Sequence, residues 1–490
     1  MSAALRQLFR TKPLSELQEE GATSSLSRKL GTLDLIGLGI GAIIGAGIFA
    51  TVGTAAAGDA ARPGAGPGII LSFVLTAAVC GLAAFCYAEL AALVPIAGSA
   101  YTYAYATLGE LLAWIIGWDL IIEYAVGNIA VAISWSGYFC EMLRGVGIVI
   151  PPWLSTDLRT ALHSPDIVAS APHLFGIPLI VNLPAAAIVL LITWVLVTGI
   201  KESARLNATM VIMKLVVLGF FVAVGAFYVQ PANWKPFMPN GWHGVWAGAA
   251  IVFFAFIGFD AVSTVAEETR NPGRDLPRGI IGSLIISTVI YVIVAAVVTG
   301  MVPWFDLHTA EPLTVAMNRY NLGWAAGIVA VGSVAAHTAV LLVFQLGQPR
   351  IFYSMARDGL LPKAFAKVHP KHHTPHVTTI LTGVVVAAFA AFANIEEMVD
   401  LTNIGTLFAF ALVSAGVIVL RRTNPQAHRP FRVPLVPWLP LTAMAACIFL
   451  AAGLPLVTWL RFAIWLVVGM AIYFSYGRSR STLGRGQKIT

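Results

Sequence analysis

Long stretches without charged residues recur along almost the whole chain and constrain its fold more than any other feature. Each is about 20 residues long, the length that an α-helix needs to cross ~30 Å of hydrocarbon at ~1.5 Å per residue. Of the 490 residues, 58% are hydrophobic and 11% are charged, whereas a soluble domain has about 25% charged residues. The sequence therefore predicts an all-α integral membrane protein surrounded by a lipid bilayer.

Polar breaks divide these stretches into twelve predicted transmembrane helices. They lie near 33–56, 69–94, 111–139, 179–200, 210–228, 245–266, 280–302, 324–346, 377–393, 401–420, 438–454 and 457–476. Of the 30 lysines and arginines, 23 lie in the tails and alternate loops on one side of the membrane, six lie toward the other side, and Lys214 lies at mid-span. Since cytoplasmic loops carry the excess of basic residues, we expect a multi-pass protein of the cell membrane with both termini in the cytoplasm. This scattered positive charge also argues against a nucleic-acid partner, which needs a single basic face.

Glycines interrupt the first and sixth predicted spans at mid-membrane. The first reads Gly39-Ile-Gly-Ala-Ile-Ile-Gly45-Ala-Gly47, and the sixth reads Phe253-Phe-Ala-Phe-Ile-Gly258-Phe-Asp260. The two spans cross in opposite directions, and glycine-interrupted segments at matching positions of inverted halves indicate a transporter's binding site. We predict a LeuT-like inverted repeat of five plus five helices with discontinuous first and sixth helices. Its parts are a tail (1–31), two repeats (32–229 and 243–421), two peripheral helices (435–477) and a second tail (478–490).

The glycines of the first span have two other interpretations. Small residues four apart, such as Gly37, Gly41 and Gly45, also let helices pack closely. The run further matches a dinucleotide-binding fingerprint, but that motif needs a preceding strand in a soluble βαβ unit. The matching interruption in the sixth span favours broken helices.

A broken helix offers two kinds of unpaired backbone group. Its second half begins with free N–H groups and its first half ends with free carbonyls. An α-amino acid carries a carboxylate for the former and an ammonium for the latter. The sequence therefore predicts an amino acid substrate held by backbone, with side-chain selectivity set by neighbouring spans.

Ionisable residues within spans are functional candidates because each costs at least ~2.5–3.5 kcal/mol to insert. Counting along the helices places Lys214 at ~13 Å and Glu123 at ~18 Å depth, against a midplane at ~15 Å. Gly45 reaches the same depth. Lys214 can carry a coupling proton, or it is a permanently charged prop for the first helix. Asp260 can relay that proton or cap the second half-helix, and the sequence leaves both pairs of alternatives open.

The remaining acidic candidates lie in three places. Asp119 and Glu123, four residues apart, share one helix face. Glu123 either contacts the substrate or pairs with backbone groups or Lys214. Glu89, Glu267 and Glu268 lie near span ends, where ion pairs at an interface or gate are expected.

No cofactor or metal site is expected. The four cysteines lack the spacing of a zinc or redox site. Prolines interrupt the cluster of His369, His372, His373 and His376, and no carboxylate lies nearby. His337, inside the eighth span, is either a hydrogen-bonded packing residue or a contact in the ion pathway.

Several motifs resemble the amino acid–polyamine–organocation superfamily, most closely its bacterial cationic amino acid transporter family. They are Gly98-Ser-Ala-Tyr-Thr-Tyr103, Gly117-Trp-Asp-Leu-Ile-Ile-Glu-Tyr124, Asn271-Pro-Gly-Arg-Asp-Leu-Pro277, Arg357-Asp-Gly-Leu-Leu-Pro362 and Asn403-Ile-Gly-Thr-Leu-Phe-Ala-Phe410. The resemblance implies a substrate carboxylate near Ile43, Ala46 and Gly47 and an amine near Phe254, Ala255 and Ile257. It also implies proton coupling, because Lys214 stands where sodium-coupled relatives bind sodium. Ala46 replaces a frequent threonine, and Phe344 and Gln345 stand where relatives vary.

The sequence thus predicts a secondary active transporter that imports amino acids, cationic or broad-range, by proton-coupled symport with alternating access. An exchanger of amino acids or polyamines is the alternative, followed by an amino acid sensor that does not transport. We expect no enzyme activity, since no nucleophile–base pair, metal set or phosphate loop fits its context. The oligomeric state stays open, and a monomer is compatible with the sequence.

Overall fold

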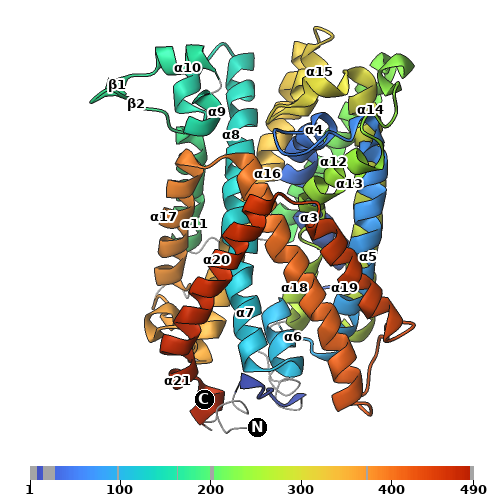
Figure 1. The fold of residues 1–490 in the computed structure, drawn as a ribbon, viewed down its shortest axis with the longest axis vertical. Coiled ribbons are helices and arrows are strands. Elements are labelled where there is room, and N and C mark those ends of the chain that lie inside the picture. Colours follow the sequence, from blue (N-terminus) through green and yellow to red (C-terminus); the bar gives the residue numbers. More distant parts are fainter. Residues whose placement is uncertain are drawn as a thin grey trace.

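A computed structural model describes residues 8–14, 28–96, 99–162, 164–198, 204–370 and 374–485. Within them the chain forms a bundle of helices that run mostly along its long axis (Figure 1). The first half contains α3 (Thr32–Ile43), η1 (Gly47–Thr51), α4 (Val52–Ala57), η2 (Gly66–Gly68), α5 (Ile69–Leu93), α6 (Ser99–Thr107), α7 (Glu110–Ile121), η3 (Ile122–Val126), α8 (Gly127–Gly145), η4 (Pro152–Leu154), α9 (Leu158–Leu162), α10 (Pro165–Ser170), α11 (Leu183–Thr198) and α12 (Ala204–Gly225).

The second half continues the bundle. It contains η5 (Ala226–Tyr228), η6 (Pro231–Trp234), α13 (Gly241–Val252), η7 (Phe253–Phe256), η8 (Asp260–Glu268), α14 (Pro272–Met301), η9 (Trp304–Leu307), α15 (Pro312–Asn318), α16 (Gly323–Arg357), η10 (Lys363–Ala366), α17 (His376–Phe392), α18 (Ile395–Thr423), α19 (Trp438–Ala451), α20 (Leu456–Ile472), η11 (Tyr473–Gly477), α21 (Arg478–Arg480) and α22 (Thr482–Arg485). Strands are limited, among the described residues, to a short antiparallel hairpin of β1 (His173–Leu174) and β2 (Ile177–Pro178).

Eight helices of the described chain are long and apolar enough to cross a membrane. The pair α3 and α4 with η1, bent by 41°, makes a ninth. The shorter apolar helices α11, α17 and α19 occupy the predicted fourth, ninth and eleventh spans. A multi-pass helical protein is confirmed, whereas the full count of twelve and the LeuT-like arrangement stay predictions.

Several helices extend beyond the apolar runs that predicted them. α18 starts six residues before the predicted 401, because the Asn394 side chain accepts the free N–H groups of Glu396 and Glu397. Such an N-cap lets a helix begin in a polar segment that hydropathy alone assigns to a loop. The hairpin and the short α9 and α10 lie between the predicted third and fourth spans and were not expected.

The outer surface of the bundle is apolar. Large side chains such as Trp194, Ile212, Val216 and Val467 are each at least half exposed. A water-soluble monomer rarely exposes so much contiguous apolar surface. These side chains are suited to contact with lipid tails.

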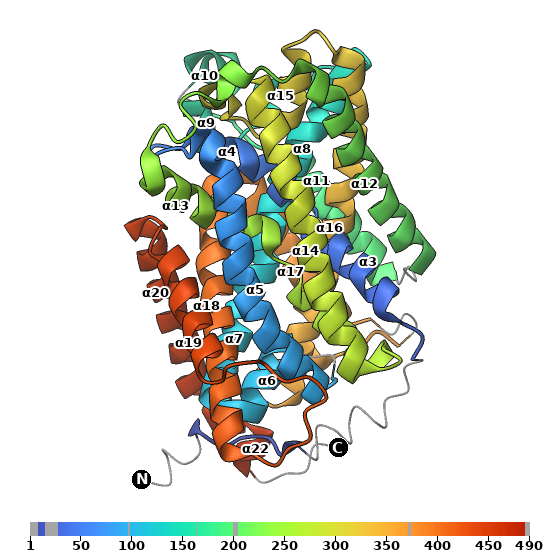
Figure 2. The same cartoon turned by 90° about the vertical axis from the view of Figure 1, so that its right-hand side faces the viewer.

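The described N- and C-terminal segments lie at one end of the bundle, here named the terminal end. The Arg10 guanidinium donates to the Leu483 carbonyl, and the Lys12 N–H donates to the Tyr105 carbonyl. α4, α9, α10 and α15 lie at the other end, named the opposite end, and α14 packs against both α3 and α5 between them (Figure 2). The two broken helices therefore lie in the interior, within reach of α12, α14 and α16.

Candidate functional site

Both predicted interruptions are present. α3 ends at Ile43, Ile44 is extended (φ −79°, ψ 101°), and helical structure resumes at Gly47. In the sixth predicted span, η7 is followed by extended Ile257 (φ −62°, ψ 133°) and by Gly258 at φ +120°. An L-residue with a side chain rarely adopts that φ. The hydrogen-bond ladder of the backbone is therefore interrupted at both breaks.

The two breaks contact each other through glycines. A Cβ at Gly47 would lie 2.2 Å from the Ala255 Cα, and a Cβ at Gly258 would lie 2.8 Å from the Ala42 carbonyl oxygen. No side chain fits in either place. The sites predicted around the first break (Ile43, Gly45, Ala46, Gly47) and the second (Phe254, Ala255, Ile257) are thus adjacent and buried.

Close packing, the alternative interpretation of the first glycine run, holds for part of it. A Cβ at Gly39 would lie 2.4 Å from the Ser283 Oγ of α14, and one at Gly45 would lie 2.5 Å from Val340 of α16. A Cβ at Gly37 would meet nothing within 4 Å. The run therefore serves both the break and the contacts with α14 and α16.

Lys214 of α12 reaches the first break. Its side chain is fully buried, and its Nζ donates to the carbonyls of Gly41, at 2.6 Å, and Ile44, at 2.8 Å. These carbonyls are free because the helix stops there. Lys214 thus takes the place of the missing intrahelical donors.

Tyr291 of α14 bridges the two breaks and was not predicted as a site residue. Its hydroxyl oxygen lies 2.8 Å from both the Ile43 and the Ala255 carbonyl oxygens, and the residue is fully buried. A lone tyrosine in an apolar run carries no charge, so nothing in the sequence separated it from ordinary core aromatics.

Glu123 and Asp260 meet at the second break. Their carboxyl groups lie close enough to influence each other electrostatically, and the Thr406 hydroxyl lies near Glu123. The Asp260 Oδ1 accepts from the Gly258 N–H at 3.2 Å. Asp260 therefore binds the backbone of the break itself, and η8, whose N-cap residue is Phe259, has no side-chain cap. Glu123 lies near this acid, while the Lys214 Nζ donates to backbone carbonyls.

Asp119 lies one turn before Glu123 and is 1% exposed. Both its carboxyl oxygens, and the Glu123 Oε2, lack a hydrogen-bond partner among the described residues. A Cβ at Gly405 of α18 would lie 2.9 Å from the Asp119 Oδ1. The shared face predicted for the two acids thus points into the bundle, toward α18 and the second break.

Apolar side chains dominate the neighbourhood of the breaks. Val340 and Phe344 of α16 project from the helix that packs against Gly45 and Gly127. Phe254 is 6% exposed. The Gln345 amide is held by Asn128 and by the Thr193 hydroxyl, so it is committed to other side chains.

His337 is a hydrogen-bonded packing residue. Its Nδ1 lies 2.7 Å from the Ser333 carbonyl oxygen, and its Nε2 lies 2.7 Å from the Ser134 hydroxyl. Its ring packs against Phe49 and Tyr138. The structure thus supports the packing interpretation left open by the sequence.

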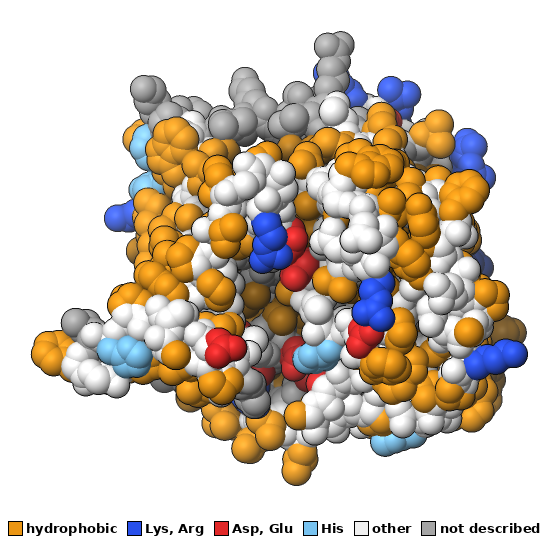
Figure 3. All heavy atoms as spheres, turned by 90° about the horizontal axis from the view of Figure 1, so that it is seen from above, with side chains coloured by type: hydrophobic (Ala, Val, Ile, Leu, Met, Phe, Trp, Pro, Cys, Tyr) orange, Lys and Arg blue, Asp and Glu red, His pale blue; other side chains and the backbone are white. Residues whose placement is uncertain are grey.

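A hollow of about 400 Å³ opens at the opposite end and reaches down to Ala50, Thr51 and Ile251 beside the breaks. Figure 3 looks onto this end and shows acidic, basic and histidine side chains gathered around the hollow. Acidic residues outnumber basic ones in its lining. They are Glu141, Asp157, Glu311, Glu396 and Asp400, against Arg62, Arg144 and His308.

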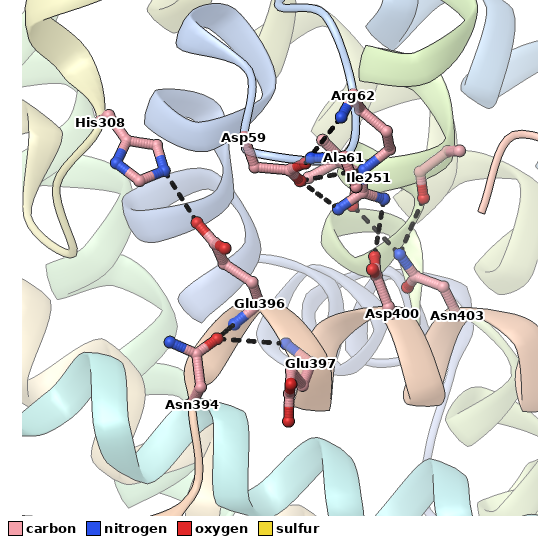
Figure 4. A network of polar contacts seen from close by, with 11 residues as sticks. Asp59, Ala61, Arg62, Ile251, His308, Asn394, Glu396, Glu397, Asp400 and Asn403 are labelled. Carbon is pink, nitrogen blue, oxygen red and sulfur yellow. Dashed lines mark hydrogen bonds and ion pairs between the residues drawn. The ribbon is translucent and has the colours of Figure 1, made fainter. Parts of the chain in front are cut away.

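One wall of the hollow is a polar network (Figure 4). Arg62, after α4, pairs with Asp59 at 2.5 Å and with Asp400 of α18 at 2.7 Å. Asn403, one turn along α18, donates to the carbonyls of Ala250, at 2.8 Å, and Ile251, at 3.2 Å. The network ties the segment after α4 and the end of α13 to α18 along this wall of the hollow.

Comparison with known proteins agrees with this geometry. The family model described as amino acid permease matches residues 30–476. The chain belongs to the amino acid permease family. The resemblance to the amino acid–polyamine–organocation superfamily is thereby confirmed.

The relatives of this permease differ in their named substrates. It is 47% identical to the branched-chain amino acid permease BcaP of Bacillus subtilis (strain 168) over 480 residues, 98% of this chain and 99% of BcaP. It is 46% identical to the methylthioribose transporter of the same organism over 481 residues, 98% of this chain and 100% of the relative. The vacuolar cationic amino acid transporter 4 of Arabidopsis thaliana is 38% identical over 82% of this chain and 64% of its own length. These relatives are named as transporters, which agrees with the expected absence of enzyme activity.

At the terminal end of the permease, Glu89 of α5 links α18 to the segment that follows it. This buried carboxylate pairs with Arg421 at 2.7 Å and Arg429 at 3.2 Å, and it accepts the Val433 N–H at 2.6 Å. The ion pair predicted for Glu89 is confirmed. The large hollow thus lies at the opposite end, whereas this ion-pair cluster lies at the terminal end.

We expect Glu89→Gln to destabilise the permease by about 2–4 kcal/mol, because two arginines lose the charge that compensates them. The apparent melting temperature of purified permease measures this loss. Glu141→Gln is the matched control, since Glu141 pairs with a 62% exposed Arg144 and such pairs contribute ~0.2–1 kcal/mol. Equal melting temperatures for the two variants would contradict this role of Glu89.

The loop before α15 contains two groups whose pKa is raised in the folded permease. The His308 Nε2 lies 2.8 Å from the Glu396 Oε1, and this hydrogen bond raises the pKa of His308. Burial, with Glu141 nearby, raises the pKa of Glu311 to about 7. Both groups hold a proton in the folded permease at pH values where the unfolded chain has released it.

Stability should therefore fall as pH rises. The stabilisation from the His308 hydrogen bond is complete below about pH 6.5 and is lost above it. The free energy of unfolding also falls between pH 4.5 and about 7, because Glu311 loses its proton more readily in the unfolded chain than in the fold. We expect a higher apparent melting temperature at pH 5 than at pH 8, within the ~0.2–1 kcal/mol typical of an exposed pair for His308. The double variant His308→Gln, Glu311→Gln should flatten this profile, and an unchanged profile would refute the assignment.

Among the described residues, no group of three or more His, Cys, Asp or Glu could hold a metal ion. The rings of His369 and His376 pack at 5.1 Å between centroids. His372 and His373 lie outside the described residues. The four cysteines are free thiols.

Proposed function

We propose that this permease imports amino acids by alternating access, driven by inward proton movement, with the substrate at the two breaks. The observation that carries the proposal is the contact of the breaks, Gly47 on Ala255, with Lys214 bound to the carbonyls of the first. Free backbone groups of both polarities then lie in one buried place.

In this proposal the substrate carboxylate lies at the N–H groups near Gly45, Ala46 and Gly47. Its ammonium lies at the free carbonyls of the second break, near Phe254, Ala255 and Ile257. The Ile43 carbonyl is also an acceptor, so it suits the ammonium better than the carboxylate. Backbone groups then recognise the part that all α-amino acids share.

The side-chain preference follows from what surrounds the breaks. Phe254, Val340 and Phe344 favour a branched apolar side chain, in agreement with the name of BcaP. A cationic side chain is the second candidate, because the Glu123 Oε2 has no hydrogen-bond partner among the described residues and several relatives are named cationic transporters. Methylthioribose, named as the substrate of a second relative, has neither an α-ammonium nor a carboxylate. Its uptake is therefore measured beside that of the amino acids, as a test of backbone recognition.

Lys214 and Asp260 are the proposed coupling groups. Protonated Lys214 holds the Gly41 and Ile44 carbonyls with a full charge, whereas neutral lysine holds them more weakly. Asp260 and Glu123 can hydrogen-bond to each other only when one of them carries a proton. Proton uptake and release would therefore change the strength of the hydrogen bonds that Lys214 makes at the first break and that Asp260 and Glu123 make at the second.

We further propose that the terminal end faces the cytoplasm of a cell in whose membrane the permease resides. The basic loops support this orientation. The hollow then faces outward, so protons and substrate enter through an acidic vestibule.

Uptake into proteoliposomes tests the proposal. Acidic medium outside a neutral lumen should drive accumulation of labelled leucine or valine, and a protonophore should abolish it. A preference for arginine and lysine that is lost in Glu123→Gln would favour the cationic candidate. Uptake that requires internal amino acid indicates an exchanger, and binding without flux in any gradient indicates a sensor.

A further inference from the structure

The Tyr291 hydroxyl occupies an unusual position between two helix ends. The Ile43 carbonyl lacks an intrahelical partner because α3 stops there, and the Ala255 carbonyl lacks one because η7 stops one residue later, at Phe256. Both oxygens lie 2.8 Å from the same hydroxyl oxygen. Tyr291 is thus a side chain that contacts both broken helices at once.

One hydroxyl cannot satisfy both carbonyls fully. A tyrosine carries a single O–H donor, so it donates to one carbonyl at a time. A primary ammonium carries three N–H donors and a positive charge, so it can donate to both carbonyls together through charge-assisted bonds. The pair of carbonyls is therefore better matched to an ammonium than to the group that now fills it.

We propose that Tyr291 is an internal stand-in for the substrate's ammonium group. In the empty permease its hydroxyl links the two broken helices, and the arriving amine displaces it from the carbonyls. The inference rests on the proposed function, because it takes the substrate to be an amino acid bound at the breaks.

The surroundings of Tyr291 suit such a role. Its ring is fully buried, 5.4 Å from the Phe73 ring and 5.3 Å from the Phe256 ring between centroids. Aromatic neighbours fix the ring plane while leaving the hydroxyl hydrogen free to rotate between the two acceptors. The hydroxyl can therefore exchange one carbonyl for the other without moving α14.

A transport cycle contains two kinds of state, one with substrate bound and one without. Net uptake requires the empty permease to return, whereas exchange of internal for external substrate uses only loaded states. If Tyr291 links the breaks in the empty state, its hydroxyl matters for return and is dispensable when an amine takes its place. Tyr291 is a positioning residue in this sense.

The experiment compares both modes in proteoliposomes containing wild type or Tyr291→Phe permease. We expect net proton-driven uptake to fall about tenfold, the effect of losing one buried hydrogen bond. Exchange should stay within about twofold of wild type, with an equal or lower KM because no hydroxyl competes with the amine. A structural role alone would lower both modes together.

Two further tyrosines provide matched controls. Tyr87→Phe removes a buried hydroxyl without a hydrogen-bond partner among the described residues, so both modes should persist. Tyr138→Phe removes a hydroxyl that donates at 2.6 Å to the Phe49 carbonyl, on one broken helix only. It should leave the ratio of net uptake to exchange unchanged.

Three results overturn the inference: an equal loss in both modes, a raised KM for exchange, or a Tyr291→Phe variant that does not fold. In the last case the hydroxyl would be a requirement of folding rather than of the empty state. Failure of the wild type to move any amino acid in either mode would instead reject the proposed function.

Discussion

Replacement of Lys214 by alanine is expected to reduce proton-driven uptake at least about tenfold. The substitution leaves the Gly41 and Ile44 carbonyls unpaired in a buried place, at ~1–3 kcal/mol for each unsatisfied group. It also removes the group proposed to carry the proton. Initial uptake rates in proteoliposomes, with and without an inward proton gradient, measure the effect.

Lys214→Arg separates the two roles of the lysine. Arginine keeps the positive charge and N–H donors for the carbonyls but does not release its proton. We expect this variant to fold and to exchange amino acids while losing its response to the proton gradient. A full response in Lys214→Arg would show that the residue is a permanently charged prop, and a full response in Lys214→Ala would reject both roles.

A methyl group added at Gly47 is expected to reduce uptake ~10–100-fold. Its Cβ would lie 2.2 Å from the Ala255 Cα, which is backbone and cannot turn aside. The two breaks must then separate, and overpacking of this kind costs ~1–3 kcal/mol or more. Amino acid binding, measured as the thermal shift of the purified protein, should weaken in parallel with uptake.

Gly37→Ala is the matched control on the same helix. A Cβ there meets nothing within 4 Å, and alanine favours a helix over glycine by about 1 kcal/mol. Uptake by this variant should equal or exceed that of wild type. Equal losses at both positions would mean that helix flexibility, rather than the contact of the breaks, limits transport.

The sequence predicted those features that can be recognised from residue type or from spacing along the chain. The breaks were found because glycines interrupt two apolar runs at matching depths, and Lys214 because a charge is rare at mid-membrane. Glu89 was assigned to an ion pair because it lies near the end of a span. Each of these signals is local along the chain.

Features that depend on how helices face each other were not predicted. Depth counting placed Glu123 and Lys214 in one layer, yet Glu123 lies against Asp260 while Lys214 binds the first break. Counting residues gives the depth of a side chain in the membrane, but it does not say which neighbouring helix the side chain faces. Tyr291 was missed for a related reason, since its importance lies in two carbonyls that belong to other helices.

At the proposed substrate site, the contact of the two breaks restricts which residues of this permease can change. Gly47 against Ala255 and Gly258 against Ala42 leave no room for side chains, so mutation can alter little there without separating the helices. Val340 and Phe344 are under no such restriction. They contact their neighbours through side chains on the continuous helix α16, so their replacement does not force two backbones apart. Substrate range should therefore diverge through α16 and its neighbours while the centre stays constant, and engineering of new specificities should begin at those two positions.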